Sequence, residues 1–138
     1  MELLEEIYKN ASMGADSISN LIKDLESKDN KIKKELENIK KDYEEFMKKA
    51  YKELKKCKKK PKDENVMLKA MSKMNIKKEV LNDNSDSAIA DMVIQGISMG
   101  IIEMEKKIKC CEDGFAKKLA KEFIKFSEEK NEKLKQYL

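Results

Sequence analysis

The amino-acid sequence predicts an all-α protein folded as a single four-helix bundle, and two observations lead to this prediction. Charged residues make up 42% and hydrophobic residues 40% of the 138 positions, whereas Gly occurs four times and Pro once. That balance is typical of long amphipathic helices. Apolar residues also recur at steps of three and four along most of the chain, which is the helical period. A chain of this length buries one core, so we treat residues 1–138 as one domain.

The first two helices are predicted at about residues 2–27 and 31–59. Each carries a core-facing stripe of apolar and small residues. The stripe of the first helix consists of Leu4, Ile7, Ala11, Gly14, Ile18, Leu21 and Leu25. The stripe of the second consists of Ile32, Leu36, Ile39, Tyr43, Phe46, Ala50, Leu54 and Cys57. Because the polar turn around Asp29 and Asn30 is short, the two helices are expected to pack antiparallel.

Two further helices are predicted at about residues 87–109 and 115–138, and the third of the four is apolar on most sides. A helix of this kind is either central or covered by something else. Residues 61–86, which begin at Pro61 and include several methionines, form a connecting segment. An up-down bundle needs only about two to eight connecting residues, so this segment favours a long helical crossover between helices two and three. The alternative is a short fifth helix folded over the bundle end.

Two stretches of the chain carry a family resemblance. They are residues 7–18, IYKNASMGADSI, and residues 88–100, AIADMVIQGISMG. With the helix lengths, they resemble the ferritin-like bundles, in particular small ferritin-like proteins of Firmicutes. The resemblance implies a ferritin-like antiparallel bundle, and its di-iron chemistry requires two Glu and two Glu-x-x-His motifs facing inward. The chain has no His and no carboxylate in its first core stripe, so we expect neither a di-iron centre nor another cofactor.

The residue types limit the chemistry further. All 31 basic residues are Lys, because the chain has neither Arg nor His. Without Arg it lacks the planar group that binds guanine or phosphate with two hydrogen bonds, and without His it lacks the commonest general base. We therefore predict a protein that is not an enzyme. An acidic N-terminus, three cysteines and the lack of a stretch near about 20 apolar residues favour a cytoplasmic protein with no membrane contact. The use of Lys and Asn in place of Arg suggests an AT-rich bacterial genome.

Three glycines inside the predicted helices, Gly14, Gly96 and Gly100, indicate a special packing requirement. Each glycine lowers helix stability by about 1 kcal/mol relative to Ala in a helix interior, so a structural or functional reason for a missing side chain is expected at these positions. The ordinary interpretation is close packing of helix backbones. The functional interpretation is that the space beside the glycines admits a small apolar ligand.

The three cysteines, Cys57, Cys110 and Cys111, form a candidate metal or redox site. A crossover places the ends of helices two and three at the same end of the bundle and brings these thiols toward one another. Nearby lysines would stabilise thiolates, which are soft-metal ligands. The alternative is three unconnected thiols.

A lysine-rich stretch at the end of the second helix is a candidate anion-binding patch. It consists of Lys48, Lys49, Lys52, Lys55, Lys56, Lys58, Lys59, Lys60 and Lys62. Lysines at this position also favour the helix C-terminal dipole without any partner. Binding of nucleic acid would depend on salt and ignore base sequence, and the formal net charge of only +4 argues against it.

The leading functional prediction is a non-enzymatic protein of assembly or partner binding. We expect a homodimer formed through the apolar third helix or the methionine-rich part of the connecting segment. The alternatives are a thiol protein that uses Cys57, Cys110 and Cys111 for metal or redox chemistry, and non-specific nucleic-acid binding through the Lys48–Lys62 patch.

Overall fold

The protein is a bundle of helices, seen in a computed structural model that describes residues 2–57 and 84–138. Within these residues there are four α-helices and no strand, which confirms the all-α class and the four-helix prediction. The elements are α1 (Glu2–Asp24), α2 (Lys33–Lys56), α5 (Asp86–Ile108), α6 (Gly114–Leu134) and the short 3-10 helix η1 (Lys135–Tyr137). Most of the predicted crossover, residues 61–83, lies outside the described residues.

The helix ends follow local hydrogen bonding and differ from the predicted ends by up to four residues. α1 stops at Asp24 because Glu26 and Lys28 donate to the carbonyl three residues earlier, which tightens the chain into a turn. α5 starts one residue earlier than predicted, after Ser85, whose Oγ accepts a hydrogen bond from the Ala88 amide at 3.2 Å. Asp113 caps α6 in the same way through the Phe115 amide.

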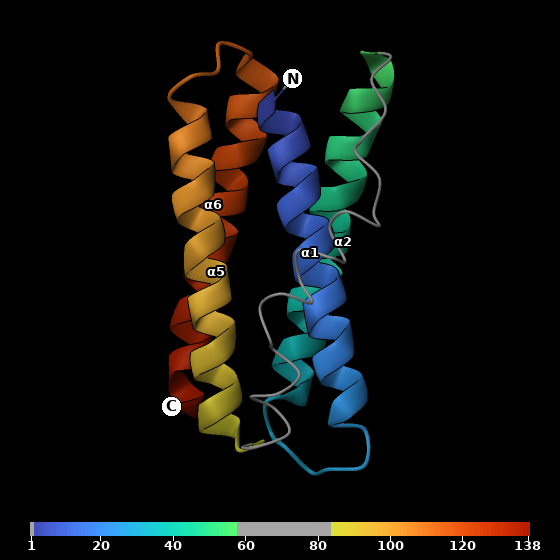
Figure 1. Ribbon diagram of the computed structural model, residues 1–138, viewed down its shortest axis with the longest axis vertical. Coiled ribbons are helices and arrows are strands. Elements are labelled where there is room, and N and C mark those ends of the chain that lie inside the picture. Colours follow the sequence, from blue (N-terminus) through green and yellow to red (C-terminus); the bar gives the residue numbers. More distant parts are fainter. Residues whose placement is uncertain (1, 58–83) are drawn as a thin grey trace.

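The helices have two distinct bundle ends in Figure 1. The turn end holds the α1–α2 turn and the start of α5, which are joined because Asn30 Nδ2 donates to Asn84 O and to Asp86 Oδ1, each at 2.8 Å. The cysteine end holds the start of α1, the end of α2 and the α5–α6 turn. α1 packs most extensively against α2, and α5 packs most extensively against α6.

The core runs along the bundle axis and receives side chains from all four helices. Every predicted stripe residue of α1 is buried except Gly14, which is half-buried, and most of the α2 stripe is buried too. Cys57 is a correction, because it is exposed where the end of α2 leaves the packed region. In the third helix Met99 and Ile102 are about half exposed, so the apolar surface of α5 is only partly covered.

α2 and α6 are held together by aromatic rings and a buried ion pair. Tyr43 and Phe46 of α2 meet Phe123 and Phe126 of α6 with ring centroids 5.2–6.0 Å apart, and we call these four residues the aromatic cluster. Nearer the turn end, Lys130 of α6 is buried, and its Nζ lies 3.4 Å from carboxylate oxygens of both Glu35 and Asp42 of α2. The charge of Lys130 thus offsets part of the negative charge of two carboxylates that lie seven residues apart in α2.

In the part of the chain that the structure describes, α5 is the one helix long and apolar enough, by length and composition, to cross a membrane. It is an exception to the expectation that no stretch approaches a membrane span. Core helices of soluble proteins meet the same criteria, and 33% of the most apolar window of α5 is buried in the bundle.

Candidate functional site

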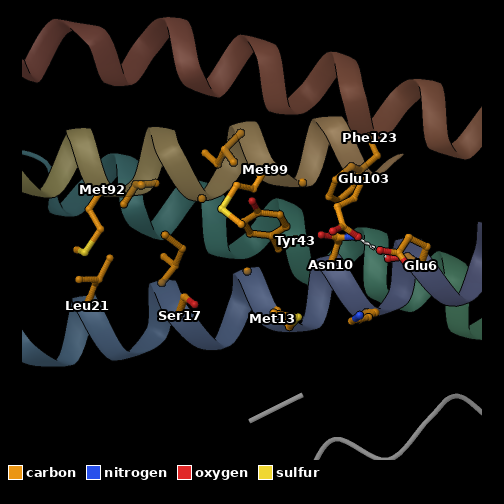
Figure 2. A pocket seen from close by; sticks show the side chains of 17 residues that line it. Glu6, Asn10, Met13, Ser17, Leu21, Tyr43, Met92, Met99, Glu103 and Phe123 are labelled. Carbon is orange, nitrogen blue, oxygen red and sulfur yellow. Dashed lines mark hydrogen bonds between the residues drawn. The ribbon is translucent and has the colours of Figure 1, made fainter. Parts of the chain in front are cut away.

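A pocket lies between α1 and α5 in the described part of the molecule, and we call it the α1–α5 pocket. Its volume is about 170 Å³. α1 and α5 form its walls, while Tyr43 of α2 and Phe123 of α6 close it from behind (Figure 2). The lining residues are Glu6, Lys9, Asn10, Met13, Gly14, Ser17, Ile18, Leu21, Tyr43, Met92, Val93, Gly96, Ile97, Met99, Gly100, Glu103 and Phe123.

All three glycines singled out in the sequence line this pocket, but the space available for a side chain differs among them. A Cβ at Gly14 would lie 2.5–2.8 Å from ring atoms of Tyr43, so only Gly lets this ring lie against α1. At Gly100 a Cβ would approach Asn10 Oδ1 at 3.4 Å, which is an ordinary contact. At Gly96, which is exposed, a Cβ would meet nothing within 4 Å, so close packing does not explain this glycine, and it lies on the solvent-open side of the pocket that it lines.

Tyr43 occupies the middle of the pocket and belongs to the aromatic cluster. It is only 6% exposed, and its hydroxyl makes no hydrogen bond with any residue in the described ranges. Burial raises the pKa of this hydroxyl, so Tyr43 stays neutral at physiological pH. A neutral, buried phenol without a partner can both donate and accept a hydrogen bond from a molecule in the pocket.

Two carboxyl groups lie at one end of the pocket. Figure 2 shows Glu6 of α1 near Glu103 of α5, whereas Leu21 and Met92 lie at the opposite end. Asn10 Nδ2 donates to Glu6 Oε1 at 3.0 Å and fixes the position of this carboxyl group. Burial is the largest cause of a raised Glu6 pKa, followed by its side-chain hydrogen bond with Glu103. Burial and the neighbouring carboxyl group therefore both disfavour the ionised form of Glu6.

The remainder of the pocket is apolar. Side chains of α1 and α5 face each other there, and Figure 2 shows Met13, Met92 and Met99 among them. Methionine is flexible and polarisable, so such a wall can adapt to ligands of different shape. Met99 is 54% exposed, which places it at the mouth of the pocket rather than in the core.

Cys57 directly follows α2, and Cys110 and Cys111 lie in the turn between α5 and α6, so all three cysteines belong to the cysteine end of the bundle (Figure 1). Cys57 and Cys110 are exposed, while Cys111 is partly buried against the core and its thiol donates to Asp113 O at 3.9 Å. Among residues 2–57 and 84–138 no group of three or more Cys, Asp, Glu or His side chains is arranged to hold a metal ion. The three thiols therefore share an end of the bundle without forming a ligand set.

The predicted anion patch is only partly within the described residues. Its described members are all exposed on the second half of α2, and they are Lys48, Lys49, Lys52, Lys55 and Lys56. Lys56 pairs with Glu53 at 3.1 Å, and Lys49 Nζ lies 5.8 Å from the centroid of the Phe46 ring. Lys58, Lys59, Lys60 and Lys62 lie outside the described ranges. These contacts are those of a solvated helix face.

Sequence reasoning missed the carboxyl end of the pocket and the role of Tyr43. A usable signal was present, because Glu6, Asn10 and Ser17 follow helical spacing beside the core stripe of α1. On α5, Gly96, Gly100 and Glu103 likewise share one face. What the sequence could not show is that these two faces are opposite each other.

Comparisons with protein-family models, with curated proteins and with solved structures found no match to this chain. The argument for function therefore rests on the site.

Proposed function

We propose that this chain is a non-enzymatic binding protein that holds a small molecule with an apolar body in the α1–α5 pocket. The observation that carries the proposal is the open space at Gly96, a helical glycine that no neighbour requires to be small. A pocket with mostly apolar walls and a few converging polar groups is the usual form of a small-molecule site. The pocket has this form, since the polar groups gather around Glu6 and Tyr43.

The pocket also favours binding over catalysis. The Tyr43 hydroxyl is held neutral by burial, and the chain contains no His that could serve as its base. The proposal accordingly assigns no catalytic residue and no cofactor.

The proposal includes a ferritin-like topology with residues 61–86 as the crossover. It is supported by the contacts of Asn30, which put the start of α5 at the turn end, whereas α2 ends at the cysteine end. A connection from α2 to α5 then joins opposite ends of the bundle, as in bundles with a long crossover.

Binding can be tested by titrating ¹⁵N-labelled protein with toluene, 2-phenylethanol and 2-phenylethylamine. We expect saturable shifts of the Gly96 and Gly100 amide signals with at least one of these probes. The Gly96→Leu variant, whose side chain enters open space, should stay folded and lose the response. The proposal is wrong if none of the three probes shifts the glycine signals, or if Gly96→Leu responds as the parent does.

A second candidate function is self-assembly, which the exposed apolar residues of α5 favour. Met99 and Ile102 are 54% and 52% exposed and lie three residues apart on one helix face. A homodimer through this face would cover them. Sedimentation should then show a dimer that Ile102→Lys dissociates, whereas a monomer at high protein concentration would exclude this function.

A further inference from the structure

We propose that the α1–α5 pocket selects amphiphilic amines, with the ammonium group between Glu6 and Glu103 and the apolar body against the methionine-lined wall. This inference rests on the proposed function and adds the chemical class of the ligand. It is carried by the geometry of the two carboxyl groups and, independently, by the unpartnered Tyr43 hydroxyl.

At the carboxyl end of the pocket no cation is paired with Glu6 or Glu103 within the described residues. Glu6 is partly buried beside the exposed Glu103, and the nearby like charge disfavours ionisation of Glu6, so a cation beside both carboxyl groups would be stabilised. Lys9 also lines the pocket and acts on Glu6 through its charge, but it is exposed and forms no ion pair with either carboxylate in the described ranges. The place between the two carboxyl groups is therefore available to a cation from outside.

An ammonium group matches the acceptors at this end. It has three N–H donors, and the pocket offers carboxyl oxygens from Glu6 and Glu103 together with the amide oxygen of Asn10. This amide is oriented, because its Nδ2 donates to Glu6 Oε1 and to Glu6 O, each at 3.0 Å. Its Oδ1 consequently faces α5 near Gly100. Three acceptors contributed by two helices thus converge on the space where a primary amine would sit.

Tyr43 gives the independent indication that a ligand belongs here. Its side chain is 94% buried, given its 6% exposure, and it lies in the pocket with a hydroxyl that has no partner in the described residues. The hydroxyl oxygen itself is not sealed from solvent, so it faces the open space of the pocket and is accessible to a bound molecule. A ligand atom with a lone pair or an N–H would satisfy this hydroxyl.

The size of the pocket limits the apolar body. A dry cavity of about 150 Å³ holds benzene, and the α1–α5 pocket measures about 170 Å³. One aromatic ring or a short alkyl chain therefore fits between the carboxyl end and Leu21, and a longer body can leave through the mouth beside Met99.

A matched series of probes separates this inference from the proposed function. 2-Phenylethylamine, 2-phenylethanol and 3-phenylpropionate have similar bodies and carry a cationic, a neutral and an anionic head. Calorimetric titration of the full chain should show the amine binding at least tenfold more tightly than the alcohol, and the carboxylate binding weakest. Glu103→Gln and Glu6→Gln should each remove most of the advantage of the amine and leave the affinity for the alcohol unchanged.

Glu105→Gln is the control, since Glu105 is an exposed acid of the same helix that does not line the pocket. It should bind the amine as the parent does. If amine and alcohol bind equally well, or if Glu105→Gln weakens the amine as much as Glu103→Gln, the ammonium inference fails while the proposed function stands. If none of the three probes binds, both fail.

Discussion

The α1–α2 pair meets the α5–α6 pair at two contacts, α2 with α6 and α1 with α5, and these two contacts differ in how completely side chains fill them. Between α2 and α6, four aromatic rings and the buried Lys130 fill the space. Between α1 and α5, glycines replace side chains and leave a pocket whose polar groups are incompletely paired. A bundle with two such contacts can obtain its stability on one side and keep the other available for binding. Tyr43 belongs to both, because its ring packs in the aromatic cluster and its hydroxyl reaches the pocket.

The largest effect is expected in the aromatic cluster. Phe126→Ala removes a buried ring that contacts three others, and we expect it to lower the free energy of unfolding by about 3–5 kcal/mol. Phe115→Ala is the matched control, since Phe115 is 45% exposed at the start of the same helix. Guanidinium unfolding followed by circular dichroism measures both. Equal losses in the two variants would mean that the cluster does not hold α2 and α6 together.

The next effect concerns Lys130. Lys130→Met leaves the carboxylates of Glu35 and Asp42 without their common counter-charge, so we expect a loss of about 2 kcal/mol. The loss stays below that of a fully buried pair because Asp42 is 40% exposed and solvent screens it. Lys135→Met, which removes an exposed pair with Glu132, should change stability by less than about 0.5 kcal/mol. A larger loss at Lys135 would contradict this ranking.

Gly14 and Gly96 should respond to the same substitution with opposite signs. Gly14→Ala forces a methyl group against the Tyr43 ring, and we expect a loss of about 1–2 kcal/mol. This value is a net effect, since better helix propensity offsets part of the strain. Thermal unfolding of the variant measures it. A stabilised Gly14→Ala variant would show that Tyr43 moves away without cost.

At Gly96 the new methyl group meets open space, so Gly96→Ala should stabilise the protein by up to about 1 kcal/mol through helix propensity alone. The same thermal measurement applies. Destabilisation would mean that the space is filled in solution, and the gain in stability should come with weaker binding of the pocket probes.

The smallest effect is a dependence of stability on pH. Because the pKa of Glu6 is higher in the folded protein than its ordinary value of 4.5, the folded state binds more protons than the unfolded state above that pH. Stability therefore falls as the pH rises from 4.5 through the folded-state pKa. Glu6→Gln should remove this decrease and make the protein more stable than the parent at pH 7. An unchanged pH profile of the denaturation midpoint would contradict the assignment.

The sequence was sufficient for the helices and insufficient for the site. Steps of three and four place the core faces of α1 and α2 well, since these faces are determined within each helix. Cys57 was misassigned to the core stripe because helical spacing does not show where packing against the neighbouring helix stops. The glycines were noticed, yet Gly14 and Gly96 look alike in sequence, and only the position of Tyr43 distinguishes a close contact from an open space. The burial of Lys130 could not be predicted, because the sequence does not distinguish a lysine that faces a neighbouring helix from one that faces solvent.

The hydrogen bonds of Asn30 bear on the order in which the chain folds. α1 with α2, and α5 with α6, are neighbours in sequence, so each pair can form from local contacts before the pairs meet. Asn30 instead bonds to groups 54 and 56 residues away, and such contacts require a long loop to close first. We therefore expect the slow step to be the association of the α1–α2 pair with the α5–α6 pair, and the Asn30 hydrogen bonds fix how the two pairs align. The α1–α5 pocket is lined by residues of both helix pairs, so it should form only when the two pairs associate.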